Sequence, residues 1–137
     1  MTHNEISSII INVAIEIRKK LGPGLLESVY LAVLEYELKK RGLDVRKEVS
    51  IPVQWDDLHL EIGFRADLIV EGKVLVELKS VEEVAPVHKK QVFTYIKLTY
   101  LLLGLLVNFG AELLKYGIHR IINGVIEDQQ SDLTQEL

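Results

Sequence analysis

The sequence contains no cysteine among its 137 residues, which excludes disulfide bonds and thiolate metal ligands. It also lacks a long apolar run. The most apolar stretch, residues 101–107, is far shorter than the ~20 residues that a membrane helix needs. Residues 1–10 have no basic segment ahead of their apolar residues, so they do not have the pattern of a secretory signal peptide. We therefore expect a cytoplasmic protein without a membrane partner.

Positive charge is also scarce. The chain has 16 Lys and Arg residues against 20 Asp and Glu residues, a net charge of −4. This balance argues against binding to nucleic acid through bulk positive charge. A metal ion held by local carboxylates could still supply the positive charge that faces a phosphate. The mean hydropathy of +0.19 is somewhat high, which fits a well-buried sheet or a dimer interface.

Apolar periodicity predicts an α/β protein with one domain over residues 1–124. A polar tail over residues 125–137 is either a short helix or disordered. Helices are expected at about residues 2–21, 26–42 and 85–101, the first with a capping box formed by Thr2 and Glu5. Strands are expected at residues 45–53, 58–68, 73–80, 105–109 and 116–122. Gly104 is expected to break the third helix.

Two acidic residues and a lysine carry the clearest chemical signal. Glu77 and Lys79 are two residues apart in a predicted strand, so they share one face. Asp67 lies on the preceding strand. Two carboxylates beside an amine could hold a divalent cation next to a base, which suits the cleavage of a phosphodiester. The alternative is a solvated hairpin face with alternating charges.

The length of the loop between these strands decides whether the acids can meet. If Glu71 and Gly72 formed a two-residue turn, Asp67 would lie opposite Val76, and the two carboxylates would point to opposite faces. A three-residue loop, or a bulge at Gly72, shifts the register by one and brings Asp67 and Glu77 together. A metal site therefore predicts an odd-numbered loop.

Two helices carry further candidates. Gln91 and Tyr95 are four residues apart on one helix face, with His88 three residues before Gln91. These side chains could orient a water or a phosphate oxygen, or Tyr95 could simply pack in the core. Glu27 lies in the first turn of the second helix, with Tyr30 on the same side. Glu27 is either a third carboxylate at the site or a helix-terminal acid, which is favourable there in any case.

Three other residues could border the same site. Arg65 shares the face of Asp67 and could contact a phosphate or form a salt bridge with Glu61. Trp55, in a predicted turn, could stack on a base or cover a core edge. Asn108, at the end of a predicted strand, is expected near the site.

These features form an ordered set: an acid on an early helix, D–ExK on a hairpin, and QxxxY on the next helix. In this order the chain resembles the PD-(D/E)XK nuclease superfamily, particularly its RecB-like branch, and more closely the small bacterial GxxExxY proteins. Ala66 stands where the motif's name has proline. The matching segments are GPGLLESVY, FRADLIVEGKVLVELKSVE, PVHKKQVFTYIK and LLVNFG.

The resemblance implies a restriction-endonuclease-like core, with a central mixed β-sheet flanked by α-helices. It also implies metal-dependent hydrolysis of DNA or RNA. Asp67 and Glu77 would bind Mg²⁺ or Mn²⁺ together with the backbone carbonyl of Leu78. Lys79 would position or deprotonate the attacking water and steady the phosphate. Glu27 would be an extra ligand or would hold a water of the ion.

The remaining residues implied by the resemblance are Gln91 and Tyr95, which would line the site. A homodimer or a partner protein could supply specificity, because a chain of this size has little room for a separate specificity domain. Two other functions stay open: a catalytically inactive module of the same fold that binds nucleic acid or a partner protein, and a structural dimer without a nucleic-acid role.

Overall fold

The computed structural model describes residues 1–61 and 63–126, which fold as a mixed sheet between two layers of helices. The helices are α1 (His3–Leu21), α2 (Glu27–Lys40), α3 (Pro86–Leu98) and a short 3₁₀ helix η1 (Leu114–Tyr116). The strands are β1 (Val45–Ser50), β2 (Val53–Trp55), β3 (Leu58–Leu60), β4 (Arg65–Val70), β5 (Val74–Lys79), β6 (Leu103–Asn108) and β7 (Ile118–Ile122). The expected α/β architecture is confirmed.

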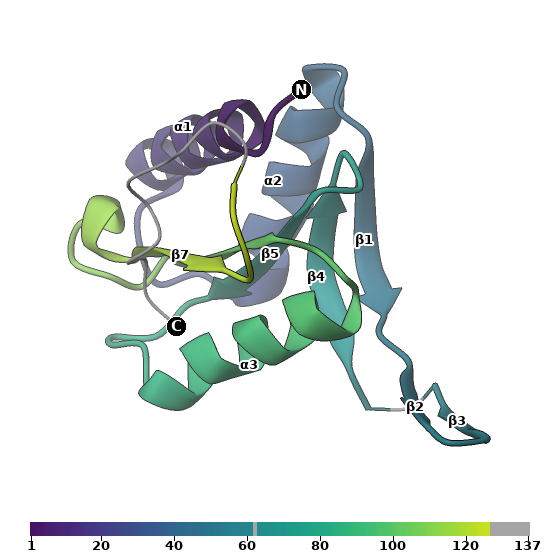
Figure 1. Ribbon diagram of the computed structural model, residues 1–137. Helices are drawn as coiled ribbons and strands as arrows, with labels where there is room; N and C mark the ends of the chain where they lie inside the picture. The colour runs from purple at the N-terminus through teal and green to yellow at the C-terminus, as the bar shows by residue number, and fades with distance from the viewer. Residues whose placement is uncertain (62, 127–137) are drawn as a thin grey trace.

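The main sheet has the strand order β1-β4-β5-β6-β7. All neighbouring pairs are antiparallel except β5 and β6, which are parallel and are connected through α3. Helices α1 and α2 cover one face of the sheet and α3 covers the other (Figure 1). Strand β5 lies between these layers, so five of its six residues are buried. This explains why its sequence is a nearly continuous apolar run that Glu77 interrupts.

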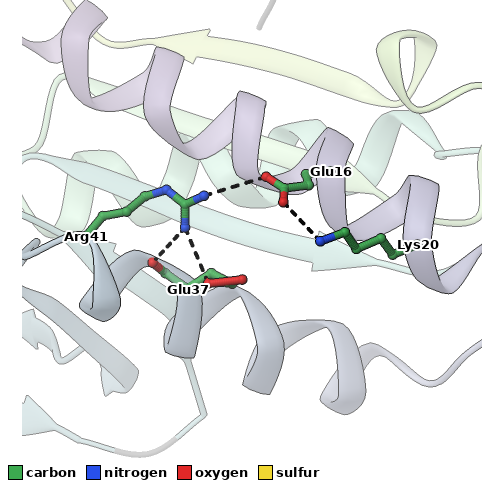
Figure 2. Close-up of polar contacts among 4 residues, drawn as sticks. All are labelled: Glu16, Lys20, Glu37 and Arg41. Atoms are coloured by element: carbon green, nitrogen blue, oxygen red, sulfur yellow. Dashed lines mark hydrogen bonds and ion pairs between the residues drawn. The ribbon is translucent and has the colours of Figure 1, made fainter.

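The first two helices follow from local signals. Thr2 and Glu5 form the expected capping box, in which each backbone N–H bonds the other residue's side chain at 3.1 and 2.9 Å. Figure 2 shows how α1 and α2 are linked at their surface: Arg41 lies 3.6 Å from Glu16, which also contacts Lys20 at 3.2 Å. These pairs are solvent-exposed, so they fix the helix pair only weakly compared with the apolar residues beneath them.

The strand predicted over residues 58–68 is wrong as a single element. The chain leaves the main sheet after β1 and forms the separate β2–β3 hairpin, which projects from the body of the protein (Figure 1). It returns to the sheet at β4. The break has a local cause: Gly63 adopts a φ of +108°, which no regular strand contains. The alternation of apolar residues therefore continues through a point where the backbone turns.

Gly104 does not end the third helix, contrary to expectation. That helix ends at Leu98, and Gly104 lies inside β6. A Cβ atom on Gly104 would come within 2.6 Å of Cγ1 of Val92 on α3. Glycine is required here because it lets the helix approach the sheet closely.

The described part of the C-terminal region includes Ile126, which is buried in the core between the sheet and α1 and α2. The prediction for the rest of the tail, residues 127–137, falls outside the described residues. Across residues 1–61 and 63–126, no helix has the length and apolar character needed to cross a bilayer.

Candidate active site

The site begins with the register of the β4–β5 hairpin. Val70 pairs with Val74, so the connecting loop contains three residues, and Leu68 pairs with Val76. Glu71 and Gly72 both adopt left-handed conformations, with φ of 56° and 63°. The predicted odd-numbered loop is confirmed. It places Asp67 and Glu77 on one face, opposite each other, one step beyond the last ladder pair.

Where this ladder ends, the side-chain carboxylates accept hydrogen bonds from backbone N–H groups of the neighbouring strand. The backbone N–H of Asp67 donates to Oε1 of Glu77 at 2.9 Å. The backbone N–H of Leu78 donates to Oδ2 of Asp67 at 2.8 Å. Each carboxylate is therefore held by the backbone of the neighbouring strand, and each has a second oxygen outside these bonds. This reciprocal arrangement fixes both side chains without a counter-ion between them.

Burial makes this pair electrostatically costly. Glu77 is only 6% exposed. Burial, together with the negative charge of Asp67, raises the pKa of Glu77 from 4.5 to about 8. Burial also raises the pKa of Asp67, although the bond from the Leu78 N–H opposes this effect. At neutral pH the metal-free site therefore retains a proton on Glu77, and a nearby cation would favour its release.

Lys79 follows Glu77 by two residues on β5, next to Asn108 of the parallel strand β6. Its positive charge opposes the rise in the pKa of both Asp67 and Glu77. The side chain is half-buried, so it remains accessible from solvent. The structure thus brings Asp67, Glu77 and Lys79 together at one end of β5.

Glu27 approaches this group without joining it. It is the exposed first residue of α2, and its negative charge raises the pKa values of both Asp67 and Glu77. Over residues 1–61 and 63–126, however, no three His, Cys, Asp or Glu side chains gather closely enough to form a metal site. Glu27 therefore lies near the two carboxylates, but it is not a third member of their cluster.

Gln91 and Tyr95 lie on the face of α3 that borders the site. Tyr95 is buried, and its pKa is raised by burial and then by the charge of Glu77, while a hydrogen bond from the Gln91 side chain opposes the rise. The ring of Tyr95 therefore packs in the core, as one alternative expects, and the charges of Glu77 and Asp67 reach its hydroxyl. His88 has a different role, because its Nδ1 accepts the N–H of Ala85 at the start of α3.

At the border of the site, the structure decides between the alternatives for two residues and gives a third an additional role. Arg65 pairs with Glu48 at 3.5 Å, and not with Glu61. Trp55 is 74% exposed on the β2–β3 hairpin, so it does not cover a core edge. Asn108 is buried and accepts the N–H groups of Val81 and Gly110, each at 3.0 Å, through its side-chain oxygen. Asn108 therefore ties two loops together.

Tyr30 of α2 is a structural anchor, a role that its spacing in the sequence does not predict. It is fully buried, and its ring stacks on Phe109 with 4.3 Å between centroids. Its hydroxyl donates to the carbonyl of Gly22 at 2.6 Å and accepts the N–H of Leu25 at 3.2 Å. Ser80 donates to the Leu25 carbonyl at 2.7 Å. These bonds hold the loop before α2 against the end of β5, which is why Glu27 lies near the site.

The donor atoms fit a hard divalent cation. Mg²⁺ prefers oxygen ligands, and it commonly takes one or two carboxylates from the protein and keeps several waters. Asp67 and Glu77 offer two carboxylates with one oxygen each outside the bonds to the backbone. Burial, and then the negative charge of neighbouring acids, raises the pKa values of both groups, and a bound cation would stabilise their ionised forms. A site with two carboxylates meets this requirement without Glu27.

Comparison with known families agrees with the geometry. A family model described as the PD-(D/E)XK nuclease superfamily matches residues 4–121. The chain belongs to the PD-(D/E)XK nuclease superfamily, and its five-stranded mixed sheet flanked by helices is consistent with the restriction-endonuclease-like fold. Nucleases of this superfamily generally use divalent metal ions to act on nucleic acid. Neither the curated proteins nor the solved structures gave a match to this chain.

Proposed function

We propose that this protein is a metal-dependent nuclease that hydrolyses phosphodiester bonds in DNA or RNA. The observation that supports this proposal best is the three-residue hairpin loop, whose register turns Asp67 and Glu77 toward each other. Lys79 follows on the same strand face, and its charge acts on both carboxyls. This arrangement agrees with membership of the nuclease superfamily.

In this proposal Asp67, Glu77 and the carbonyl of Leu78 hold Mg²⁺ or Mn²⁺. The ion supplies positive charge at the phosphate and lowers the pKa of water. Lys79 positions the attacking water and steadies the phosphate through its ammonium group. Glu27, whose charge acts on both carboxyls, holds a water at the edge of the site.

The α3 residues complete the proposed site. The Gln91 side chain bonds the Tyr95 hydroxyl, and together they line the side of the site that faces α3. We also assign the chain to the GxxExxY proteins of the RecB-like branch, because Glu27 and Tyr30 occupy the positions in that motif. A cytoplasmic location and a homodimer or partner protein that adds specificity belong to the same proposal.

The test is cleavage of labelled single-stranded and duplex DNA and RNA in Mg²⁺, in Mn²⁺ and in a chelator. We expect cleavage only with a metal ion. Asp67→Asn keeps an oxygen that can accept the Leu78 N–H but removes the charge, so it should reduce cleavage by at least about 100-fold. Lys79→Ala should reduce it by about 10²- to 10⁴-fold, the range for a group that transfers or positions a proton.

Asp57→Asn is the matched control, because Asp57 carries an exposed carboxylate in the turn between β2 and β3. It should leave cleavage unchanged. Circular dichroism would establish that each variant is folded. Equal cleavage by wild type and by folded Asp67→Asn and Lys79→Ala variants would contradict the proposed site.

A catalytically inactive module that binds nucleic acid or a partner protein is the second candidate function. It is favoured by one observation: in the part of the chain that the structure describes, Glu27 does not complete a cluster of three metal-binding side chains. Binding of nucleic acid without cleavage in Mg²⁺ or Mn²⁺ would select this alternative.

A further inference from the structure

An exposed aromatic ring borders the candidate active site. Phe64 immediately precedes β4 and packs on Tyr95, with 5.6 Å between ring centroids and 55° between ring planes. The pKa of the Tyr95 hydroxyl is in turn raised by burial and then by the charges of Glu77 and Asp67. Phe64 nevertheless stays 37% exposed. Phe64 is therefore partly open to solvent, and Tyr95 lies between it and the carboxylate pair.

A cation lies next to this ring. Arg65 shares the strand face of Asp67, two residues along β4, and its side chain is 68% exposed. Its ion pair with Glu48 spans 3.5 Å, and the Glu48 side chain is 50% exposed. An exposed pair of this kind contributes little free energy, so a phosphate can replace Glu48 as the partner of Arg65.

The ring and the cation border one cavity of about 410 Å³. Its lining residues are Ser50, Glu61, Gly63, Phe64 and Arg65. Ser50 pairs with Arg65 across β1 and β4, and Asp67 lies two residues further along β4. The cavity therefore lies along the same strand as the metal-binding carboxylate that we propose.

We propose that this cavity binds an unpaired nucleotide next to the phosphate that is cleaved, with its base stacked on Phe64 and a phosphate paired with Arg65. The inference rests on the proposed function, because it names the substrate class of that same site: single strands and frayed ends. A fully paired duplex is a poor substrate.

Stacking explains the preference for unpaired nucleotides. Bases inside a duplex have both faces covered by their neighbours, so only an unpaired or terminal base can offer a face to Phe64. Phosphate attraction contributes less at this site. The chain carries a net charge of −4, and Glu48 and Glu61 lie at the same border as Arg65. Stacking must therefore supply a large share of the binding free energy.

The experiment compares binding of a labelled single strand and of the blunt duplex of the same sequence, in DNA and in RNA. Fluorescence anisotropy would be measured in Ca²⁺, with the integrity of the nucleic acid checked on a gel. The single strand should bind at least about 10-fold more tightly than the duplex. Phe64→Leu should weaken single-strand binding by about 10-fold, within the range for loss of one base–aromatic stack.

Three further variants separate stacking from other effects. Phe64→Trp keeps an aromatic face and should retain tight binding of the single strand. Tyr36→Leu removes a 65% exposed ring on α2, away from the cavity, and should change nothing. Arg65→Ala should weaken binding and lower the slope of log affinity against log salt by about one. Thermal melting would establish that Phe64→Leu remains folded despite its contact with Tyr95.

The outcomes distinguish this inference from the proposed function. Equal or tighter binding of the blunt duplex, or unchanged single-strand binding by folded Phe64→Leu, overturns the inference even if the wild type cleaves nucleic acid. Single-strand binding that depends on Phe64 supports the inference even if cleavage is never detected. Binding of neither substrate overturns it.

Discussion

Replacing Glu77 by glutamine should stabilise the metal-free protein, and the gain should grow as the pH rises. Burial and the charge of Asp67 raise the pKa of Glu77 from 4.5 to about 8. Between these values the folded protein keeps a proton that the unfolded chain releases, so the free energy of unfolding falls with increasing pH. Glutamine does not titrate, and its amide oxygen can still accept the Asp67 N–H.

The magnitude follows from the width of this pH window. Each pH unit between the two pKa values costs the wild type roughly 1.4 kcal/mol, and the full window amounts to roughly 5 kcal/mol. Wild type and Glu77→Gln should therefore have similar stability near pH 5. The variant should be more stable by several kcal/mol at pH 8.

Urea unfolding in a chelator at pH 5, 6, 7 and 8 would measure this difference. Glu82→Gln is the control, because it removes an exposed carboxyl in the loop before α3; it should retain the pH dependence of the wild type. Added Mg²⁺ should stabilise the wild type at pH 8 and narrow its difference from Glu77→Gln. A difference between the two proteins that stays constant from pH 5 to pH 8 would refute the raised pKa of Glu77.

Three other predictions concern the ion, the loop before α2 and the packing of α3. Because Glu77 has a pKa of about 8, Mg²⁺ binding at pH 7 should release close to one proton. The affinity for Mg²⁺ should rise toward pH 8. Calorimetry in buffers of different ionisation enthalpy measures both the proton release and the affinity. Tyr30→Phe removes the hydroxyl that bonds Gly22 and Leu25, which should lower the free energy of unfolding by about 1–3 kcal/mol in urea titrations. Gly104→Ala would bring a Cβ within 2.6 Å of Val92 and should destabilise by about 1–3 kcal/mol, measured in the same way.

Each of these has its own contradicting result. Mg²⁺ binding at pH 7 without proton release would place the ion away from Glu77. A Tyr30→Phe protein as stable as the wild type would show that the Tyr30 hydroxyl does not stabilise the loop before α2. For Gly104→Ala, the double variant with Val92→Ala should cost less than the sum of the two single changes. Strict additivity would show that Val92 is not the side chain that Gly104 accommodates.

Much of the architecture could be predicted because it depends on contacts between residues close in sequence. The capping box at Thr2 and Glu5 and the apolar stripes of the first two helices are local patterns, and the helices begin close to where these patterns place them. The candidate residues on the β4–β5 hairpin could be named for the same reason. Their order along the chain identifies the superfamily, and spacing in a strand puts Glu77 and Lys79 on one face.

Long-range contacts decided the rest. The register that joins Asp67 to Glu77 depends on a loop in which the backbone and side chain of Glu71 bond Asp44, 27 residues earlier, at 2.7 and 2.6 Å. The sequence predicts that Gly104 breaks a helix, because its actual role appears only when α3 lies against β6.

The burial of the carboxyl pair is also a tertiary property. Glu77 has the same chemistry in the unfolded chain, but its pKa rises only when the sheet and α3 exclude water and bring Asp67 beside it. Amino-acid order is therefore sufficient to identify the ionisable groups. The distance between these groups and their burial from water arise from chain folding. Both depend on segments that are distant in sequence and meet only in the folded protein.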